Sequence, residues 1–456
     1  MKPILHTLLA GTAGALLAIT LPTAVDAAQS GDGNPTWREF DTLVDVFLKV
    51  RDSYVDETAD KDLIEGAIRG MLQSLDPHSS YLNARDSESM RTQTDGEYGG
   101  LGLTVQAAEG AVKVVAPTDD TPAARAGMKS GDFITHIDDQ LIIGMSLDEA
   151  VDRMRGAPGT KIKLTVIRPG EPEPLTFNLV REMIHLRPVK AEAKGNVGVI
   201  RISTFNRQTG DDTRKAVTDL TREIGPGLAG FVLDLRSNPG GLLDQAVDVS
   251  DVFLERGEIV SQRGRSKDDI ERYYARRDDL AAGKPIVVLV DGGSASAAEI
   301  VAGALQDQKR ALVIGERTFG KGSVQTLIPL SSDTALRLTT ARYYTPSGKS
   351  VQEAGIEPNI VVPQLTDPVR SRRQRVREAD LRNHLLAETK ADDELVEDDG
   401  KPERRFDKSA EDLEKAGIKD FQLYYAVDLV SRLAPAGSGA SVAVAGTAGT
   451  GAGARP

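Results

Sequence analysis

The chain has 456 residues, of which 40% are hydrophobic and 27% charged, a composition typical of a globular protein with more than one core. Its 56 Lys and Arg against 68 Asp and Glu leave a net charge of −12, which argues against a general nucleic-acid-binding protein. Cysteine is absent, which excludes disulfides, thiolate metal sites and a cysteine nucleophile, and the five widely spaced His argue against a zinc hydrolase.

Residues 1–27 have the pattern of a secretory signal peptide. Lys2 precedes an apolar run over 8–21, and small residues follow it as far as Ala27. We therefore expect export to a bacterial periplasm or cell envelope. An uncleaved membrane anchor is the alternative, although the run is short for a membrane span.

Residues 36–94 are predicted to form a small helical region. Two amphipathic helices are expected, and the second stops before Pro77. Their apolar stripes usually indicate core packing, and a dimer contact is the alternative. The first stripe consists of Trp37, Phe40, Val44, Phe47 and Tyr54.

Residues 97–182 are predicted to form a compact β-rich domain. Ala111–Ala116 and Lys161–Ile167 alternate in polarity as half-buried strands do. Two helix-like stretches, Pro122–Met128 and Leu147–Met154, lie between them.

Residues 183–364 alternate between strand and helix patterns. Such alternation favours an α/β layer with parallel strands and right-handed crossovers. The predicted strands are Val197–Ile202, Phe231–Leu235, Pro285–Val290 and Ala311–Ile314, and the predicted helices are Asp212–Ile224, Asp244–Phe253 and Ser296–Gln306. Two later strands, Ser323–Pro329 and Ala335–Tyr344, look antiparallel.

The remainder, 365–434, is predicted to be a charged, solvated and partly flexible stretch followed by a pair of helices near Ala410–Leu433. The Ala/Gly-rich tail, 435–456, is expected to be disordered.

A glycine-rich loop, Gly315–Ser323, nearly matches a phosphate-binding P-loop. The match fails after Lys321, where Gly322 replaces the Ser or Thr that would hold Mg²⁺. The residues that follow alternate like a strand, whereas phosphate binding needs a helix amino terminus. The sequence therefore disfavours a nucleotide site, and Lys321 is either a surface turn residue or a catalytic lysine.

Two serines, Ser294 and Ser296, lie where a buried strand is expected to turn into a helix. A serine at such a turn is most often an N-cap. It can also be a nucleophile, because nearby amide groups can stabilise an oxyanion. Without a nearby His, the base could be a lysine whose pKa is lowered by burial, and Lys321 is the natural candidate.

The chain resembles the carboxyl-terminal processing proteases, also called tail-specific proteases, a family of PDZ-containing peptidases with a Ser-Lys dyad. The resemblance covers most of 36–430. It rests on five segments: Leu75–Leu82, Leu233–Leu243, Gly293–Ile300, Phe319–Gln325 and Thr340–Gly348. Their occurrence together and in this order is a strong signal.

The resemblance assigns roles to three residues of the protease core. Ser296 would be the nucleophile, and Lys321, 25 residues later, the general base. Gln325 would orient Lys321 by a hydrogen bond. Family members often have a third serine in this run, whereas this chain has Ala298.

The resemblance also implies an oxyanion hole. The glycines that follow Asn238 would bring a backbone amide, from Gly240 or Gly241, close to the substrate carbonyl. The amide of Ala297 would be the second donor. A plain strand-to-helix turn is the alternative reading of these glycines.

Residues 97–182 would be a PDZ domain by the same resemblance. Its carboxylate-binding loop would comprise Gly100, Leu101, Gly102 and Leu103, and a free C-terminus would add as a strand beside it. Arg168 lies where relatives use an arginine to sense the bound state; otherwise it is a surface charge at a strand end.

The sequence thus predicts a multidomain α/β fold with a helical N-terminal region, a PDZ domain, a protease core and a helical C-terminal region. The predicted function is that of an exported serine endopeptidase that needs no cofactor or metal. Its partners would be protein or peptide substrates with accessible C-terminal tails, with an adaptor protein and a homo-oligomer as further possibilities. A non-catalytic PDZ scaffold that binds protein C-termini is the alternative function.

Overall fold

The computed structural model describes residues 35–108, 110–266, 268–366, 376–387 and 410–434. The chain divides into two units, Met1–Ile68 and Arg69–Pro456. The predicted signal peptide and the C-terminal tail lie outside the described residues. Across these ranges, no helix combines the length and the apolar character needed to span a membrane.

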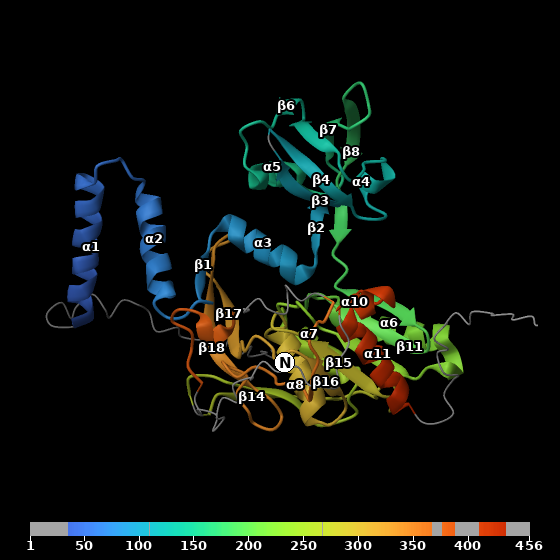
Figure 1. Cartoon of the computed structure of the whole chain (residues 1–456). Coiled ribbons are helices and arrows are strands. Elements are labelled where there is room, and N and C mark those ends of the chain that lie inside the picture. Colours follow the sequence, from blue (N-terminus) through green and yellow to red (C-terminus); the bar gives the residue numbers. More distant parts are fainter. Residues whose placement is uncertain (1–34, 109, 267, 367–375, 388–409, 435–456) are drawn as a thin grey trace, which may run out of the picture. The chain divides into compact units, whose positions relative to one another are not determined.

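The described chain begins with two helices, α1 (Pro35–Ser53) and α2 (Asp60–Gln73), joined by a short turn (Figure 1). Both amphipathic patterns form helices as predicted. Their apolar side chains are not buried, however: Trp37 is 51% and Phe40 is 56% exposed. Interpreting the first stripe as core packing is therefore wrong for the single chain, because two helices alone offer too little surface to cover it.

The N-terminal region also contains a strand that its sequence pattern does not reveal. β1 (Ser80–Leu82) pairs antiparallel with β18 (Ala335–Tyr344), far along the chain. Three residues are too few to show a periodicity. Helix α3 (Ala84–Asp95) follows, and the side chain of its N-cap, Asn83, accepts a hydrogen bond from the amide of Asp86.

The β-rich domain is an antiparallel sheet with two short helices. Two further strands, β2 (Glu97–Gly100) and β9 (Glu182–His185), pair with each other as the chain enters and leaves it. The sheet order is β3 (Leu103–Ala108), β4 (Ala111–Pro117), β5 (Phe133–Ile137), β7 (Lys161–Ile167) and β8 (Leu175–Val180), with β6 (Gln140–Leu141) beside β5. The helices are α4 (Pro122–Arg125) and α5 (Leu147–Met154).

The larger domain contains a six-stranded, mostly parallel sheet. Its order is β10 (Val189–Lys194), β11 (Val197–Ile202), β12 (Gly230–Asp234), β15 (Ile286–Val290), β16 (Leu312–Gly315) and β19 (Ile360–Val361), and only β10 runs antiparallel to its neighbour. The helices packed against it are α6 (Thr209–Ile224), α7 (Leu243–Asp251), α8 (Ala297–Asp307) and α11 (Phe421–Leu433).

Both faces of this sheet are buried, which explains why its strands are continuous apolar runs. In β15, Ile286, Val288 and Val290 belong to the core that includes α6, α7 and α8. Val287 and Leu289 belong to a second core that includes α11. Because these strands are parallel, their carboxyl ends lie at one edge of the sheet. The loops that follow them at this edge carry polar residues.

A second sheet supports that edge. β18 lies at its centre and pairs with β1, with β17 (Ser323–Pro329) and with β13 (Glu258–Arg263), which pairs in turn with β14 (Ile270–Tyr274). The remaining described elements are the 3₁₀ turns η2 (Gly225–Gly227) and η3 (Glu378–Asp380) and the short helix α10 (Ala410–Lys415).

The predicted multidomain α/β fold is confirmed, with local differences. Helix α4 ends at Arg125 rather than Met128, because Gly127 has a positive φ of 82°. Part of the stretch that was predicted to be solvated is instead packed: residues 376–387 are described, and Glu378 among them is fully buried. The high charge of a segment predicts that it is solvated only where its charged side chains have no buried partners elsewhere in the fold.

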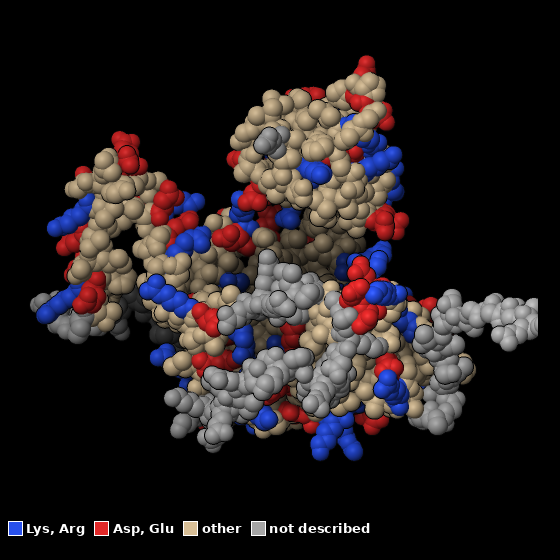
Figure 2. Space-filling model, in the orientation of Figure 1, with Lys and Arg blue, Asp and Glu red and all other residues tan. Residues whose placement is uncertain are grey.

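Acidic and basic side chains are mixed over the face of the molecule drawn in Figure 2, and no broad basic patch forms there. This distribution agrees with the net charge of −12 in disfavouring nucleic acid as a general partner.

Helix α11 is attached to the end of β12 by a partly buried ion pair. Asp420, its N-cap, accepts hydrogen bonds from Arg236 Nη1 at 2.9 Å and Nη2 at 2.7 Å. Burial alone would raise the pKa of Asp420, but the guanidinium of Arg236 lowers it to about 2.

We predict that Asp420→Asn lowers the free energy of unfolding by about 1–3 kcal/mol at pH 7, because Arg236 loses an anionic partner. Since the folded pKa lies below the unfolded value, the wild-type advantage is present above pH 4 and shrinks as the pH falls towards 2. Urea unfolding at several pH values measures it. The control is Asp428→Asn, which breaks an exposed pair with Arg432 on the same helix and should change stability by no more than about 0.5 kcal/mol. Equal effects of both variants would contradict the prediction.

Candidate active site

Ser296 lies at the turn where β15 gives way to α8. Its backbone has φ 55° and ψ −114°, a conformation that costs a non-glycine residue roughly 1–3 kcal/mol. The residue is 7% exposed and immediately precedes the first helical amides, which have no partner within the helix. Backbone strain of this kind is a frequent property of functional turns.

The other serine of the turn, Ser294, is committed to holding the turn together. It is fully buried. Its hydroxyl donates to the carbonyl of Leu235 at 2.9 Å and accepts from the amide of Asp291 at 2.9 Å. Ser294 is therefore a structural residue, and Ser296 is the better candidate nucleophile.

Lys321 follows β16 in a loop that leads into β17. Its Nζ donates to Gln325 Oε1 at 2.5 Å. The amide nitrogen of Gln325 donates to Ser323 Oγ at 2.9 Å and to Thr339 Oγ1 at 3.3 Å. Because two hydroxyls hold the amide nitrogen, the amide oxygen is directed at the lysine, as the resemblance implied.

The environment of Lys321 favours its neutral form. Burial is the main cause that lowers its pKa to about 8, and the positive charge of Arg337 acts in the same direction. The carboxylates of Glu378, Glu299 and Asp76 oppose this change. A lysine with this pKa is partly unprotonated near neutral pH and can accept a proton, as a general base must.

A buried carboxylate joins the two candidate catalytic residues. Glu299 Oε2 accepts hydrogen bonds from the backbone amides of Ser296, at 2.8 Å, and Lys321, at 2.9 Å. Its Oε1 accepts from Thr318 Oγ1, at 2.5 Å, and from the amide of Gly320, at 2.8 Å. One side chain on the first turn of α8 therefore fixes the turn after β15, residues 291–296 and here called the serine turn, against the loop after β16, residues 316–322 and here called the lysine loop.

Glu299 is fully buried, and this burial raises its pKa to about 7 although its four hydrogen-bond donors act to lower it. The raised value means that ionised Glu299 is less well solvated in the folded protein than in the unfolded chain. Its contribution to stability is thus fully present at acid pH and decreases as the pH rises through about 7.

The predicted oxyanion-hole residues lie beside Ser296. A Cβ on Gly240 would be 2.8 Å from the Cβ of Ser296 and 3.0 Å from the amide nitrogen of Ala297. On Gly241, a Cβ would be 2.1 Å from the carbonyl oxygen of Phe205. Only glycine permits these approaches. The Gly240 amide itself donates to Asn238 Oδ1 at 2.8 Å.

The structure also bears on the nucleotide alternative. The residues after Gly322 form strand β17 rather than a helix. The loop thus lacks the helix amino terminus that a phosphate would need. In the part of the chain that the structure describes, no group of three or more His, Cys, Asp or Glu is placed to hold a metal ion.

Three family models match this chain. The model of peptidase family S41 matches residues 196–362, that of the PDZ domain matches 113–168, and that of the activating protease CtpB N-terminal domain matches 19–86. The carboxy-terminal-processing protease of Bartonella bacilliformis is 49% identical over 382 residues, which cover 83% of this chain and 88% of that protein. This chain belongs to the family of carboxy-terminal processing proteases.

Two further relatives are similar. The carboxy-terminal processing protease CtpA of Bacillus subtilis is 35% identical over 336 residues, covering 73% of this chain and 70% of that protein. The solved structure of a photosystem II D1 C-terminal processing protease is 32% identical, covers 69% of this chain and 86% of that chain, and superposes with a TM-score of 0.41. The resemblance inferred from the motifs is confirmed, and this protease is a peptidase with a PDZ domain.

The PDZ domain of this protease has a strand with one unpaired side at the edge of its described sheet. β3 is the outermost strand of the sheet and pairs with β4 alone among the described strands. The predicted carboxylate loop leads into it: Gly100 ends β2, Leu101 is buried in the domain core, Gly102 has a φ of 76° and Leu103 begins β3.

Arg168 is held within the PDZ domain by hydrogen bonds to Asp132 and Gly127. Its Nε donates to Asp132 Oδ1 at 2.7 Å and its Nη2 to Asp132 Oδ2 at 2.8 Å. Nη2 also donates to the carbonyl of Gly127 at 2.9 Å. Arg168 is thus not the free surface charge of the alternative reading, and its proposed sensing role would require it to leave this bidentate pair.

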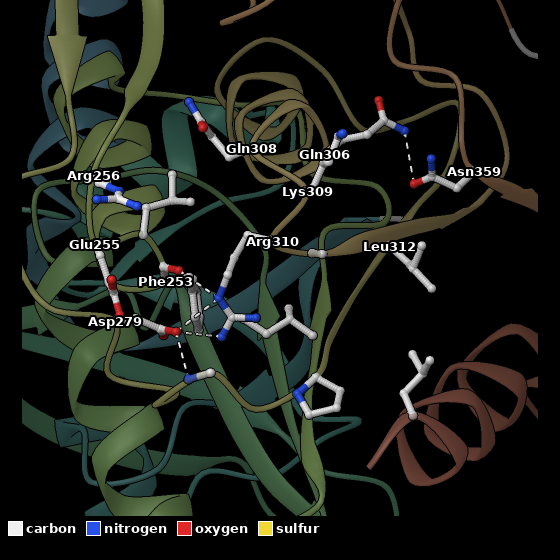
Figure 3. Close-up of a pocket in the computed structure, with 16 residues that line it drawn as sticks. Phe253, Glu255, Arg256, Asp279, Gln306, Gln308, Lys309, Arg310, Leu312 and Asn359 are labelled. Carbon is white, nitrogen blue, oxygen red and sulfur yellow. Dashed lines mark hydrogen bonds and ion pairs between the residues drawn. The ribbon is translucent and has the colours of Figure 1, made fainter. Parts of the chain in front are cut away.

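A cavity lined by residues of the sheet's opposite end lies away from these residues (Figure 3). It has a volume of about 850 Å³ and lies near the amino ends of β15 and β16, whereas Ser296 follows the carboxyl end of β15. Arg310 crosses it and bonds to Asp279. Parallel α/β sheets bind ligands at the carboxyl ends of their strands, so this cavity is not the candidate active site.

Sequence reasoning missed Glu299 as a site residue. The pattern of an acidic residue three positions after a serine N-cap indicates a capping box, and its carboxylate does accept the Ser296 amide. The bonds to Gly320 and Lys321 come from a loop that no local pattern links to α8. The signal available in the sequence was one glutamate among the small and apolar residues that begin this helix.

We predict that Glu299→Gln lowers kcat of this protease by about 100-fold or more, because small displacements of catalytic groups are costly. An amide cannot accept all four hydrogen bonds, so the free energy of unfolding should also fall by about 1–3 kcal/mol for each unsatisfied donor. Peptide hydrolysis and urea unfolding measure the two effects. The control is Glu223→Gln on the exposed side of α6, and wild-type kcat in Glu299→Gln would contradict the role of the carboxylate.

Proposed function

We propose that this protease is a serine endopeptidase in which Ser296 is the nucleophile and Lys321 the general base. The observation that carries the proposal is the shared acceptor Glu299 Oε2, which holds the backbones of both residues at one point. The lowered pKa of Lys321 and its bond to Gln325 support it, because they supply an oriented amine that is partly neutral. The strained turn at Ser296 supports the choice of nucleophile.

The proposed reaction has two stages. In acylation, Ser296 Oγ attacks the scissile carbonyl carbon and Lys321 Nζ takes the hydroxyl proton. The tetrahedral oxyanion is stabilised by the amide of Ala297 and by an amide of the loop at Gly240 and Gly241. The C–N bond then breaks, and Lys321 gives its proton to the leaving amine.

In deacylation, Lys321 removes a proton from water, which attacks the ester carbonyl of the acyl-enzyme. The oxyanion forms again in the same site. When it collapses, the proton returns to Ser296 Oγ and the new C-terminal carboxylate leaves. Because lysine and amides supply every proton and charge contact, the proposed mechanism needs no metal or organic cofactor.

The dyad is not hydrogen-bonded side chain to side chain in the described structure: Lys321 Nζ donates to Gln325 rather than to Ser296 Oγ. Catalytic hydrogen bonds often tighten only when substrate binds. This supports the further proposal that a substrate tail docked on the PDZ domain moves Ser296 and Lys321 into register.

We predict that Ser296→Ala and Lys321→Ala each lose cleavage of an unstructured protein by at least about 10³-fold. Wild-type activity should be unchanged by EDTA. Its kcat/KM should rise with pH through about 8, because Lys321 must be unprotonated to act as a base. Cleavage that persists in Ser296→Ala would contradict the nucleophile assignment, and a folded but inactive wild type that still binds tails would instead favour a scaffold.

We further propose that the PDZ domain captures substrate C-termini along the free edge of β3. An extended tail would add as a strand, and backbone amides of the loop at Gly100–Leu103 would hold its carboxylate. The exposed edge of β3 in the described sheet supports this placement.

We predict that a peptide with a free C-terminal carboxylate binds this protease at least about tenfold more tightly than the same peptide with a C-terminal amide. The amide cannot supply the negative charge that a row of backbone N–H groups favours. Fluorescence anisotropy with Ser296→Ala measures binding without cleavage. Equal affinities would contradict carboxylate recognition.

The location and assembly of the protease are also proposals. The signal-peptide pattern in residues 1–27 supports export to the periplasm or cell envelope, and N-terminal sequencing of the mature protein tests it. The exposed apolar face of α1, with Trp37 and Phe40, supports a homo-oligomer. Sedimentation of Trp37→Asp against wild type would show whether this face joins subunits. An adaptor that delivers substrates remains part of the proposal by family analogy alone.

A further inference from the structure

The segment 376–387, here called the strap, packs against the lysine loop. The backbone amide of Glu378 donates to the carbonyl of Phe319 at 3.2 Å. Nη2 of Arg377 donates to the carbonyls of Glu353 and Ala354, at 3.0 and 3.2 Å. The strap lies beyond the residues matched by the S41 family model, which end at 362.

Glu378 is the buried centre of the strap. It is fully buried, and its carboxylate accepts from His78 Nε2, at 2.8 and 3.0 Å, and from Gln352 Nε2, at 2.9 Å. His78 belongs to the Leu75–Leu82 motif, to which the proposed mechanism gives no role. A buried carboxylate with a histidine partner so close to a catalytic loop calls for an explanation.

Gln352 connects Glu378 to the lysine loop. Its Oε1 accepts from the amide of Gly322 at 3.0 Å, and its Nε2 also donates to the carbonyl of Leu385 in the strap at 2.9 Å. Gln352 is fully buried, so both ends of its amide are fixed by these bonds. The residue after Lys321 is thus tied through one side chain to Glu378.

The lysine loop is therefore bonded to two buried acidic residues. The carboxylate of Glu299 accepts from the amides of Gly320 and Lys321. The backbone amide of Glu378 donates to the carbonyl of Phe319, and its carboxylate is linked to the amide of Gly322 through Gln352.

The charges that face Lys321 come from every element around it. Glu299 is on α8, Arg337 on β18, Asp76 in the turn before β1 and Glu378 on the strap. Arg337 Nε also donates to the carbonyl of His78 at 3.0 Å, which fixes the motif against the same site. The negative charge of Glu378 stabilises protonated Lys321. Burial acts to raise the pKa of Glu378, but its bonds to His78 and Gln352, and to a lesser degree the charge of Lys321, lower it.

We propose that Glu378 is a positioning residue for Lys321: paired with His78, it holds the lysine loop through Phe319 and Gln352 and places a negative charge beside the lysine. This inference rests on the proposed function, in which Lys321 is the general base. The proposal also gives the Leu75–Leu82 motif a role, because its residue His78 is a hydrogen-bond partner of the buried carboxylate of Glu378.

Three variants separate position from charge. Glu378→Gln keeps the shape and removes the charge, so we expect kcat to fall about tenfold or more. The rising limb of kcat/KM should move to lower pH by roughly 0.5–1 unit, because protonated Lys321 loses a stabilising anion. Gln352→Met breaks the link to Gly322 and keeps the negative charge of Glu378. We therefore expect kcat to fall while KM stays within about twofold of the wild-type value, and the rising limb should stay at its wild-type pH.

The control is Arg382→Gln. Arg382 is an exposed residue of the strap, so this substitution removes a surface charge and leaves the bonds of Glu378 and Gln352 in place. This variant should leave the rising limb at its wild-type position. Cooperative urea unfolding of each variant shows that it is folded.

If the rising limb of kcat/KM in Glu378→Gln stays at the wild-type pH, the charge role is overturned. If Gln352→Met keeps the wild-type kcat, the positioning role is overturned, whether or not Glu378→Gln folds. Either result leaves the proposed function standing as long as Ser296→Ala and Lys321→Ala are inactive. Activity in those two variants would instead overturn the proposed function itself.

Discussion

The site depends on one buried carboxylate that accepts four hydrogen bonds from two chain segments. Glu299 ties the serine turn after β15 to the lysine loop after β16, and Thr318, which donates to it, also accepts from the amide of Ile356 at 2.7 Å. Because Glu299 is fully buried, such bonds have few competitors and fix geometry closely. The strain at Ser296 is maintained by this surrounding network, since an isolated turn would relax.

The sheet explains why these segments can meet. β12, β15 and β16 are adjacent and parallel, so the glycine loop after β12, the serine turn after β15 and the lysine loop after β16 emerge at one edge. Burial of both faces of the sheet makes that edge rigid, and β17 and β18 extend it with Gln325 and Thr339. Burial also lowers the pKa of Lys321, so the packing that stabilises the fold also favours the neutral lysine that the proposed mechanism requires.

The fold and the family were predictable from the sequence because their signals are local. The continuous apolar run at 286–290 predicts a strand, and the small-residue turn with Ser296 predicts the start of a helix. The motifs around Ser296 and Lys321 identify the family. What connects the site is not local. Glu299, Gln352 and Glu378 act on partners from separate segments, and β1 is too short for a periodic pattern. The charged strap looked solvated because its buried partners, His78 and Gln352, lie far away in sequence.

The central claim is that Ser296 and Lys321 act as a nucleophile–base pair held together by Glu299. Its most direct test is the rate at which a fluorophosphonate labels the protein between pH 6 and 10, with the labelled peptide identified by mass spectrometry. The account predicts one label, on Ser296, at a rate that rises through about pH 8 as Lys321 loses its proton and that is strongly reduced in Glu299→Gln. A label on another residue, or equal labelling rates in wild type and Glu299→Gln, would contradict it.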